Sequence, residues 1–320
     1  MKSIGIGIAA AILLVGAGGK PDRATKTKPY ASDSAAVHAR DVLKWRSERL
    51  ANLRKPDGWL SLAGLFWLDE GENKFGSAVS NKVRFPERKA PEKMGSFFLE
   101  NGKVRVRVNG GVAVTSGGKP VTEMELKTDE GGEDPTTLAM GPLTWYVIKR
   151  ADRFAVRIKD RESPGLRRFQ GIRYYPIAES WRITARFEPY VPPQLIKVPN
   201  ITGQVYDETT PGALVFERDG KTYRLDPILE KGSDELFVIF ADATSGRDTY
   251  GGGRFLYTAM PGPDNKVVLD FNRAYNPPCA FTPWATCPLP PSQNKLPIPV
   301  EAGERAYGDK GVVGPGHTVN

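Results

Sequence analysis

The stretch GGGRFLYTAMPGPDNKVVLDFNRAYNPPCAFTPWATCPLPP, residues Gly251–Pro291, joins two short apolar segments to a block rich in Pro, Asn, Arg and Tyr. The segments around Arg254 and Asp270 have the β-branched and aromatic composition of strands, and PGPDN between them predicts a hairpin. The block that follows contains the only two cysteines of the chain, Cys279 and Cys287. Proline and asparagine at this density restrict the backbone, so the block predicts a rigid segment that supports a site or covers a sheet edge.

Upstream of this stretch the hydrophobic pattern is that of a β protein. Three segments alternate apolar and polar residues: KVRVRVN at 103–109, FAVRIKD at 154–160 and WRITARF at 181–187. Alternation of period two predicts strands with one buried face, so in the second segment Ala155, Arg157 and Lys159 lie opposite the apolar face. The tryptophans in such apolar settings are predicted to be core residues: Trp59, Trp67, Trp145 and Trp181.

Two further segments predict strands of a different kind. ALVFERDGKTYRLD at 213–226 predicts a hairpin with Asp219 and Gly220 as its two-residue turn. LFVIFAD at 236–242 is almost continuously apolar, which predicts a strand buried on both faces. No internal repeat is found.

The only long helix is predicted near the N-terminus. In SAAVHARDVLKWRSERLANLR, residues 34–54, apolar and long side chains recur at three- and four-residue spacing, with Ser34 or Asp33 as N-cap and Pro56 beyond the end. The fold class is therefore mainly β, with two antiparallel β units, each a sandwich or barrel, preceded by one amphipathic helix. The expected domains are a signal peptide at 1–19, a linker at 20–33, the helix at 34–55, an N-terminal β unit at 56–142, a C-terminal β unit at 143–307 and a disordered tail at 308–320.

The composition and the first residues of the chain indicate which partners and which cellular compartment to expect. The chain has 320 residues and a formal charge of +8, but its basic residues are spread among 37 acidic ones and form no stripe, so no nucleic-acid partner is expected. Lys2, the apolar run from Ile4 to Val15 and the small residues after it have the layout of a signal peptide. We expect export to a periplasm or cell envelope and no membrane span after signal removal; an uncleaved N-terminal anchor is the alternative. The sequence does not indicate an oligomeric state.

Export changes the interpretation of the cysteines. In an oxidising compartment two cysteines at this spacing favour a disulfide, Cys279–Cys287, in a loop stiffened by Pro283. Redox chemistry and metal binding are the alternatives. A zinc site needs four ligands, and the only histidines are His38 and His317, so neither a metal ion nor another cofactor is expected.

Several motifs resemble known families. DGWLSLAGLFWLDEGENKFGS, GGGRFLY, LDFNRAYNPPCAFTPWATCPLPPSQNKL and EAGE are similar to the family of unknown function DUF1684, over residues 40–307. This resemblance implies that the chain is related to the family, but the family has no assigned activity that could be carried over to it. Residues 71–129 resemble a forkhead-associated (FHA) domain, a β-sandwich that binds phosphothreonine peptides. This implies the fold, whereas Ser77 after Gly76, where that family has arginine, speaks against a phosphopeptide site.

The polar residues around the predicted hairpin form the candidate site. If the two strands pair, their side chains converge beside the cysteine loop. Arg254 is then a clamp for a carboxylate or phosphate, with Asn272, Arg273 and Asn276 as further ligand-binding residues. The candidate catalytic residues are Asp242 or Asp270 as general base and Tyr250 or Tyr275 as donor to a developing negative charge.

Three functions remain open at this point. The first is an exported protein that binds a small, anionic ligand near Arg254, Asp270 and Asn276. The second is a cofactor-independent hydrolase that uses Asp242 or Asp270 with Tyr250 or Tyr275. The third is a structural module of the cell envelope, in which Arg254 forms a buried ion pair with a carboxylate such as Asp270 and the proline-rich block covers a sheet edge.

Overall fold

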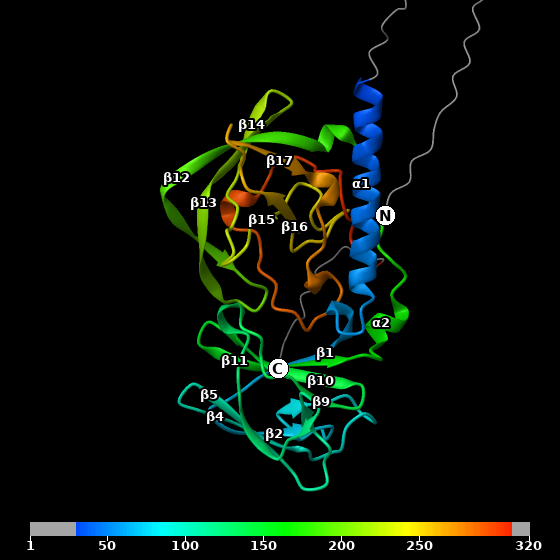
Figure 1. Cartoon of the computed structure of the whole chain (residues 1–320), viewed down its shortest axis with the longest axis vertical. Helices are drawn as coiled ribbons and strands as arrows, with labels where there is room; N and C mark the ends of the chain where they lie inside the picture. The colour runs from blue at the N-terminus through cyan, green and yellow to red at the C-terminus, as the bar shows by residue number, and fades with distance from the viewer. Residues whose placement is uncertain (1–29, 309–320) are drawn as a thin grey trace, which may run out of the picture.

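The computed structural model describes residues 30–308 and has two β units stacked end to end, with a long helix along one side of the C-terminal unit (Figure 1). This arrangement confirms the predicted fold class, mainly β with antiparallel sheets and one leading helix. The predicted signal peptide and linker lie outside the described residues, as does nearly all of the predicted tail. Within residues 30–308, no helix is both long and apolar enough to cross a membrane.

Helix α1 spans Tyr30–Leu53 and therefore begins earlier than the predicted helix at 34–55. Its buried face includes Val42 and Leu53, with Trp45 and Arg49 half-buried. These positions follow the three- and four-residue spacing of the sequence, since side chains at that spacing share one face of a helix. The only other α-helix of the described residues is short, α2 at Pro164–Arg168, and the 3-10 turns are η1 (Trp59–Ser61), η2 (Glu130–Gly132), η3 (Glu179–Trp181), η4 (Phe271–Arg273), η5 (Pro278–Ala280) and η6 (Ser292–Asn294).

The N-terminal unit is a sandwich of two sheets. One sheet has the strand order β1-β11-β10-β9-β6-β7 and the other β3-β2-β4-β5-β8, and all pairs except β2 with β3 are antiparallel. The strands are β1 (Leu62–Trp67), β2 (Gly71–Gly76), β3 (Val83–Arg84), β4 (Gly95–Glu100), β5 (Lys103–Val108), β6 (Thr115–Ser116), β7 (Lys119–Pro120), β8 (Glu123–Leu126), β9 (Leu138–Met140), β10 (Leu143–Arg150) and β11 (Arg153–Asp160).

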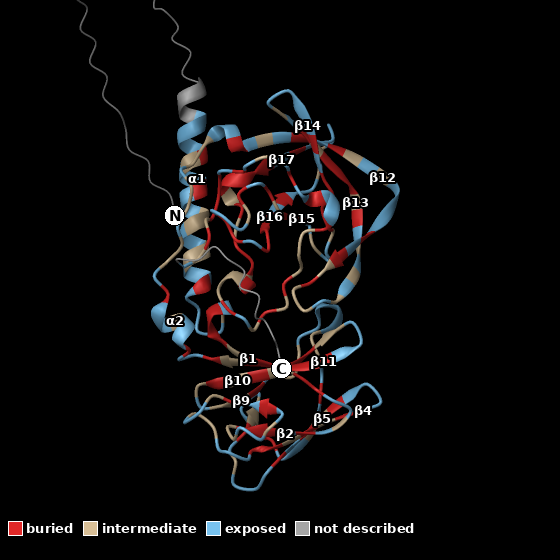
Figure 2. Cartoon of the chain, turned by 180° about the vertical axis from the view of Figure 1, so that it is seen from behind, coloured by how far each residue is buried: buried red, intermediate tan, exposed pale blue. Residues whose placement is uncertain are grey.

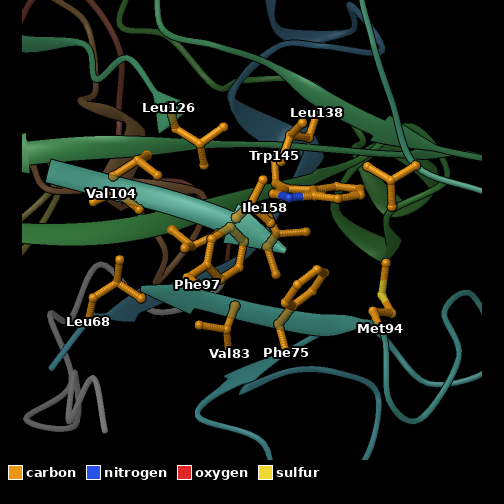
Figure 3. Packing of buried hydrophobic residues seen from close by; sticks show 14 of the residues in the cluster. Leu68, Phe75, Val83, Met94, Phe97, Val104, Leu126, Leu138, Trp145 and Ile158 are labelled. Carbon is orange, nitrogen blue, oxygen red and sulfur yellow. The ribbon is translucent and has the colours of Figure 1, made fainter. Parts of the chain in front are cut away.

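Aromatic side chains from both sheets fill the space between them. Figure 3 shows Phe75, Phe97, Trp145 and Ile158 pointing into this core. Phe75 and Phe97 have ring centroids 4.6 Å apart, and Phe85 meets Trp145 edge-on at 4.9 Å. Such pairs add to the free energy gained by burial of apolar area, so this cluster fixes how the two sheets face each other.

The N-terminal unit continues past the expected boundary at 142/143. β9 pairs with β10 across this boundary, and Trp145, Val147 and Val156 lie in the same core as Phe75. The turn-rich segment that indicated a boundary is instead a loop inside the unit. The first β unit of the structure therefore extends to Asp160.

The outer face of this first sheet is also buried. Leu65, Trp67, Ile148 and Ala155 form an apolar cluster there, against which Trp284 of the C-terminal unit packs. Figure 2 shows β11 as a mostly buried strand between the two units. Alternation in the sequence marks Ala155 and Arg157 as the polar face of an ordinary two-faced strand, whereas the C-terminal unit covers that face.

The C-terminal unit pairs a four-stranded sheet, in the order β14-β13-β12-β17, with the two-stranded sheet β15-β16. Its core draws on both sheets, with Leu214, Phe216, Val238, Leu256 and Leu269 among its members. The strands are β12 (Arg182–Pro199), β13 (Val205–Arg218), β14 (Lys221–Leu225), β15 (Glu235–Phe240), β16 (Arg254–Ala259) and β17 (Lys266–Asp270).

Two predicted features of this unit are confirmed and one is wrong. β13 and β14 form the hairpin at Asp219 and Gly220, and β15 is buried along Leu236–Phe240. The hairpin expected between the segments of Arg254 and Asp270 does not form, because β16 pairs with β15 and β17 pairs with β12. Two prolines in PGPDN supply no N–H donors where such a ladder would begin, which disfavours that pairing.

The buried and the exposed tryptophans should differ in how much they stabilise the fold. Trp67, Trp145 and Trp181 are buried as expected, but Trp59 is 41% exposed, so its predicted place in the core is wrong. We expect Trp145→Ala to lower the free energy of unfolding by about 3–5 kcal/mol, because it leaves a cavity between the sheets. Trp59→Ala, the matched control, should lower it by less than about 1 kcal/mol. Urea unfolding followed by circular dichroism measures both, and equal losses would contradict this packing.

Candidate functional site

Arg254 lies at the start of β16 and is fully buried, with 0% of its side chain exposed. Its Nη2 donates to Asp242 Oδ2 at 2.8 Å and to the carbonyl oxygen of Val300 at 2.8 Å, and its Nη1 donates to the carbonyl oxygen of Ala302. Asp242 Oδ1 accepts from the amide and the hydroxyl of Thr244. A guanidinium enclosed in this way neutralises a carboxylate of the protein itself, and both of its terminal nitrogens already donate to the protein.

The segment that surrounds Arg254 closes this network. The amide of Val300 donates to Asp242 Oδ1 at 3.1 Å, so the ion pair holds residues 300–304 against the sheet. Gly303 has φ of +78°, and a Cβ there would lie 2.4 Å from the carbonyl oxygen of Ala274. Only glycine fits so close a backbone approach, which shows how tightly the segment is packed.

Asp270 has a different partner from the one expected. Its Oδ2 lies 2.8 Å from His38 Nε2, and His38 Nδ1 lies 2.6 Å from Glu179 Oε2. The pair Arg254–Asp270 therefore does not exist, and Asp270 instead attaches helix α1 to the C-terminal unit. Arg273 Nε lies 3.4 Å from the same carboxylate. Asp270 and Arg273 line a cavity of about 890 Å³, whose wall includes both acidic and basic side chains.

The predicted amide ligands are bonded within the protein. Asn272 donates to the carbonyl oxygen of Ala178 and accepts from its amide, each at 2.9 Å. Asn276 donates from Nδ2 to the carbonyl oxygen of Arg305 at 2.7 Å. Tyr250 is buried beside the cysteines. The structure thus divides the predicted site residues into the pair Arg254–Asp242 and a group of Asp270, Asn272 and Arg273. Of the predicted catalytic set, only Tyr275 lines the cavity described next.

A second cavity lies where α1, the outer face of the N-terminal sheet and the C-terminal unit meet; we call it the interunit cavity. Its volume is about 690 Å³. Helix α1 contributes Trp45 and Arg49, and strands β10 and β11 contribute Arg150 and Arg157. The aromatic residues that line it are Trp45, Trp59, Phe237, Phe255, Tyr257 and Tyr275.

Three arginines line the interunit cavity, and two of them have carboxylate partners. Arg49 Nε donates to Glu304 Oε1 at 3.0 Å, and Arg150 donates through two nitrogens to Asp129, each at 2.8 Å. Arg157 is only 3% exposed, and no carboxylate of residues 30–308 pairs with it. Its Nη2 donates to Thr286 at 3.1 Å, whereas its Nε is buried without a partner.

The tyrosines of the cavity wall keep their protons. Burial raises the pKa of Tyr275 and of Tyr257 well above the usual value, so both hydroxyls are donors at neutral pH. Tyr257 donates to Glu230 Oε2 at 2.9 Å. The rings of Phe237 and Tyr257 are stacked at 4.7 Å, and those of Tyr257 and Tyr275 are nearly parallel at 6.5 Å. One wall of the cavity is therefore a row of aromatic rings that stack on one another.

The two cysteines are next to each other but are not bonded. Both are buried free thiols, so the predicted disulfide is not present in the structure. The amide of Cys279 donates to Cys287 Sγ at 3.1 Å, and the amide of Cys287 donates to Cys279 Sγ at 3.3 Å. A hydrogen bond from the Cys287 thiol lowers the pKa of Cys279, and the charge of Arg157 acts in the same direction. Spacing in the sequence indicates proximity and not oxidation state.

Sequence reasoning missed Arg157, Arg49 and Thr286 as site residues. The only signal for Arg157 is its place in an alternating strand, where an arginine is expected on a solvated face. Arg49 carries the signal of a helical stripe, since it shares a face with Val42 and Trp45. The sequence does not show that the C-terminal unit covers the strand face with Arg157 and the helix face with Arg49, because that depends on how the units dock.

The comparisons with known proteins identify a family. Residues 167–305 match the family model described as a protein of unknown function, DUF1684. This segment of the chain therefore belongs to the DUF1684 family, which confirms the resemblance over a shorter span than the expected 40–307. No match was found among the curated proteins.

Three solved structures are similar to parts of the chain. An uncharacterized protein of Haloarcula marismortui, solved by NMR in solution, is 31% identical, with 44% of this chain and 80% of that chain covered and a TM-score of 0.38. An FHA domain from work on phosphothreonine-dependent interactions is 14% identical, with 30% and 92% covered and a TM-score of 0.21. The FhaA FHA domain, solved in complex with an intracellular domain, is 15% identical, with 30% and 97% covered and a TM-score of 0.21. The resemblance to FHA domains is thus weak.

The enclosed ion pair predicts strong coupling between its two members. We expect Arg254→Met and Asp242→Asn each to lower the free energy of unfolding by about 3–5 kcal/mol, because each leaves a buried group without its partner. The double variant should cost clearly less than the sum. A double-mutant cycle by urea unfolding measures the coupling. The surface pair Arg186–Glu188 is the control, for which little coupling is expected because water screens it, and equal coupling in both cycles would refute the structural role of Arg254.

Proposed function

We propose that this protein binds a small anionic molecule with a planar, apolar body in the interunit cavity. The observation that carries this proposal is Arg157, a buried arginine that lines the cavity without a carboxylate partner among the described residues. Desolvating an arginine is costly unless an opposite charge lies against it. A bound anion would supply that charge.

The donors around Arg157 favour a carboxylate or phosphate. A guanidinium presents its N–H groups in a planar fork that matches two oxygens of such an anion. Thr286 accepts from Arg157 Nη2 at 3.1 Å and from Arg150 Nε at 3.3 Å, which holds both side chains in place before a ligand arrives. The two acidic residues that line the cavity, Glu48 and Glu230, are exposed.

The rest of the cavity favours an apolar body. A volume of about 690 Å³ lies within the usual range of about 300–1,000 Å³ for small-molecule sites. Phe237 and Tyr257, whose rings stack on each other, line the cavity with further aromatic side chains that can pack edge to face on an aromatic group, and protonated Tyr275 offers a hydrogen bond to an oxygen. Arginine and aromatic side chains together thus support an aromatic carboxylate or phosphate as the ligand class.

This proposal keeps the anionic ligand expected from the sequence and moves its site. Arg157 replaces Arg254, whose two terminal nitrogens donate to the protein itself. Asp270 lines the other cavity without Tyr250 or Tyr275, and Tyr275 lines the interunit cavity without Asp242 or Asp270. Neither cavity combines a predicted base with its predicted tyrosine, which favours binding over the hydrolase hypothesis. Arg254 enclosed with Asp242 is what the structural-module hypothesis expects of that residue, but that hypothesis leaves the unpaired Arg157 without a role.

Removal of Arg157 should separate binding from stability. We expect Arg157→Met to raise the free energy of unfolding by about 1 kcal/mol or more, because an unpaired buried charge becomes an apolar side chain of similar length. In the wild type, benzoate and phenyl phosphate should raise the melting temperature to a saturating value, whereas benzyl alcohol should not. The variant should lose this response.

Arg186→Met is the control, because Arg186 is exposed and lies on β12. It should keep the response to benzoate and change stability by less than about 0.5 kcal/mol. Equal stabilisation of the wild type by benzoate and benzyl alcohol would contradict the anionic ligand. A variant Arg157→Met that is strongly destabilised would show that the arginine serves the fold.

We also propose that the protein is exported, on the basis of Lys2 and the apolar run from Ile4 to Val15. Mass spectrometry of the protein from its native host should find a mature N-terminus near residues 18–20. Replacing Leu13 and Leu14 by Asp should block this cleavage, because the apolar segment is what the export machinery recognises. Recovery of intact Met1 in the soluble fraction would contradict the proposal.

A further inference from the structure

We propose that Cys279 and Cys287 form a redox-active dithiol that reduces an anionic small-molecule disulfide in the interunit cavity. This rests on the proposed function, since the same arginine would bind the substrate. The inference starts from two buried sulfurs that lie side by side and from the position of one of them in the cavity wall.

The backbone of the loop 279–287 holds the two sulfurs in register. Each sulfur accepts the backbone N–H of the other cysteine, at 3.1 and 3.3 Å. N–H donors that point at sulfur stabilise its negatively charged form. Pro278, Pro283 and Pro288 stiffen the loop and its ends, so the pair is kept together without a covalent bond.

Charge around the pair favours one thiolate and one thiol. The hydrogen bond from Cys287 and the nearby Arg157 lower the pKa of Cys279, whereas burial and the charge of its partner raise the pKa of Cys287. The proton on one sulfur is thus shared with the other. Because only a thiolate attacks a disulfide, the Cys279 thiolate serves first as the base that takes the proton of Cys287.

Access from the cavity distinguishes the two cysteines. Cys287 lines the interunit cavity together with Thr286 and Arg157, whereas Cys279 does not line it. A substrate whose carboxylate is bound by Arg157 would therefore meet Cys287 Sγ first. Cys279 lies behind it, in position to attack the same sulfur afterwards.

The reaction is a two-electron exchange. The proton of Cys287 passes to Cys279, and the Cys287 thiolate attacks one sulfur of the substrate; a Cys287–substrate disulfide forms, the substrate S–S bond breaks, and the first thiolate leaves. Cys279 then loses its proton to that thiolate and attacks Cys287 Sγ. This forms the Cys279–Cys287 disulfide and releases the second thiolate, which takes a proton from water. The dithiol is oxidised and the substrate is reduced to two thiols.

Two aromatic disulfides of different charge test the proposal. The reduced, folded protein should release two equivalents of thiol from the dianion dithiobis-nitrobenzoate, and its mass should fall by two hydrogens with no adduct retained. Cys279→Ser should release one equivalent and keep a mixed disulfide, because the resolving thiol is missing. Cys287→Ser should react far more slowly, because the cysteine that lines the cavity is gone.

The role of Arg157 is read from the ratio of two rates. Arg157→Gln should lower the rate with dithiobis-nitrobenzoate, relative to the rate with neutral dithiodipyridine, by about tenfold, the loss of one charge-assisted hydrogen bond. Arg186→Gln is the matched control and should leave the ratio unchanged. In the wild type, added salt should slow only the anionic reagent, which tests the same point without a mutation.

Inert thiols in the folded protein, or two stable adducts in place of the internal disulfide, would overturn the dithiol. An unchanged rate ratio in Arg157→Gln together with no effect of salt would overturn the anionic substrate. If benzoate stabilises the protein to a saturating value but the thiols are inert, this inference is wrong and the proposed binding function is still supported.

Discussion

The C-terminal unit depends on one buried ion pair, Arg254 with Asp242. Through Arg254 the segment 300–304 is held against the sheet, because the guanidinium donates to the carbonyl oxygens of Val300 and Ala302. That segment carries Glu304, whose carboxylate accepts from Arg49 of helix α1 and from the amide of Asn276. The position of α1, and with it one wall of the interunit cavity, therefore follows from this pair.

The two buried arginines show the difference between a structural and a functional charge. Arg254 meets a carboxylate and a ring of carbonyl oxygens, so its desolvation is offset inside the fold. Within residues 30–308, Arg157 has a single neutral acceptor, the Thr286 hydroxyl. A chain that only needed to pack the two units could place an apolar residue there, as it does at Ala155 on the same face. A charge kept without a partner is consistent with a partner that comes from outside.

The sequence predicted the local elements well and their assembly poorly. Helix α1, the β13–β14 hairpin and the buried β15 follow from periodicity and turn residues, which act over a few positions. Pairing of β16 with β15 and of β17 with β12 depends on competing long-range ladders, which no local pattern contains. The same holds for the site: Cys287 and Tyr275 came from an unusual composition, whereas Arg157 required knowledge of which sheet face the C-terminal unit covers.

The rigid block after β17 has a role that joins fold and chemistry. Its loop 279–287 packs Trp284 on the N-terminal sheet and offers Thr286 to arginines from β10 and β11. A flexible loop would hold the two units together less well, because ordering its backbone at each contact would cost conformational entropy. Since the same loop carries both cysteines, any change in their bonding would act at the point where the units meet. The many prolines of this block are thus explained by the need for a fixed backbone between the two units and beside the cavity.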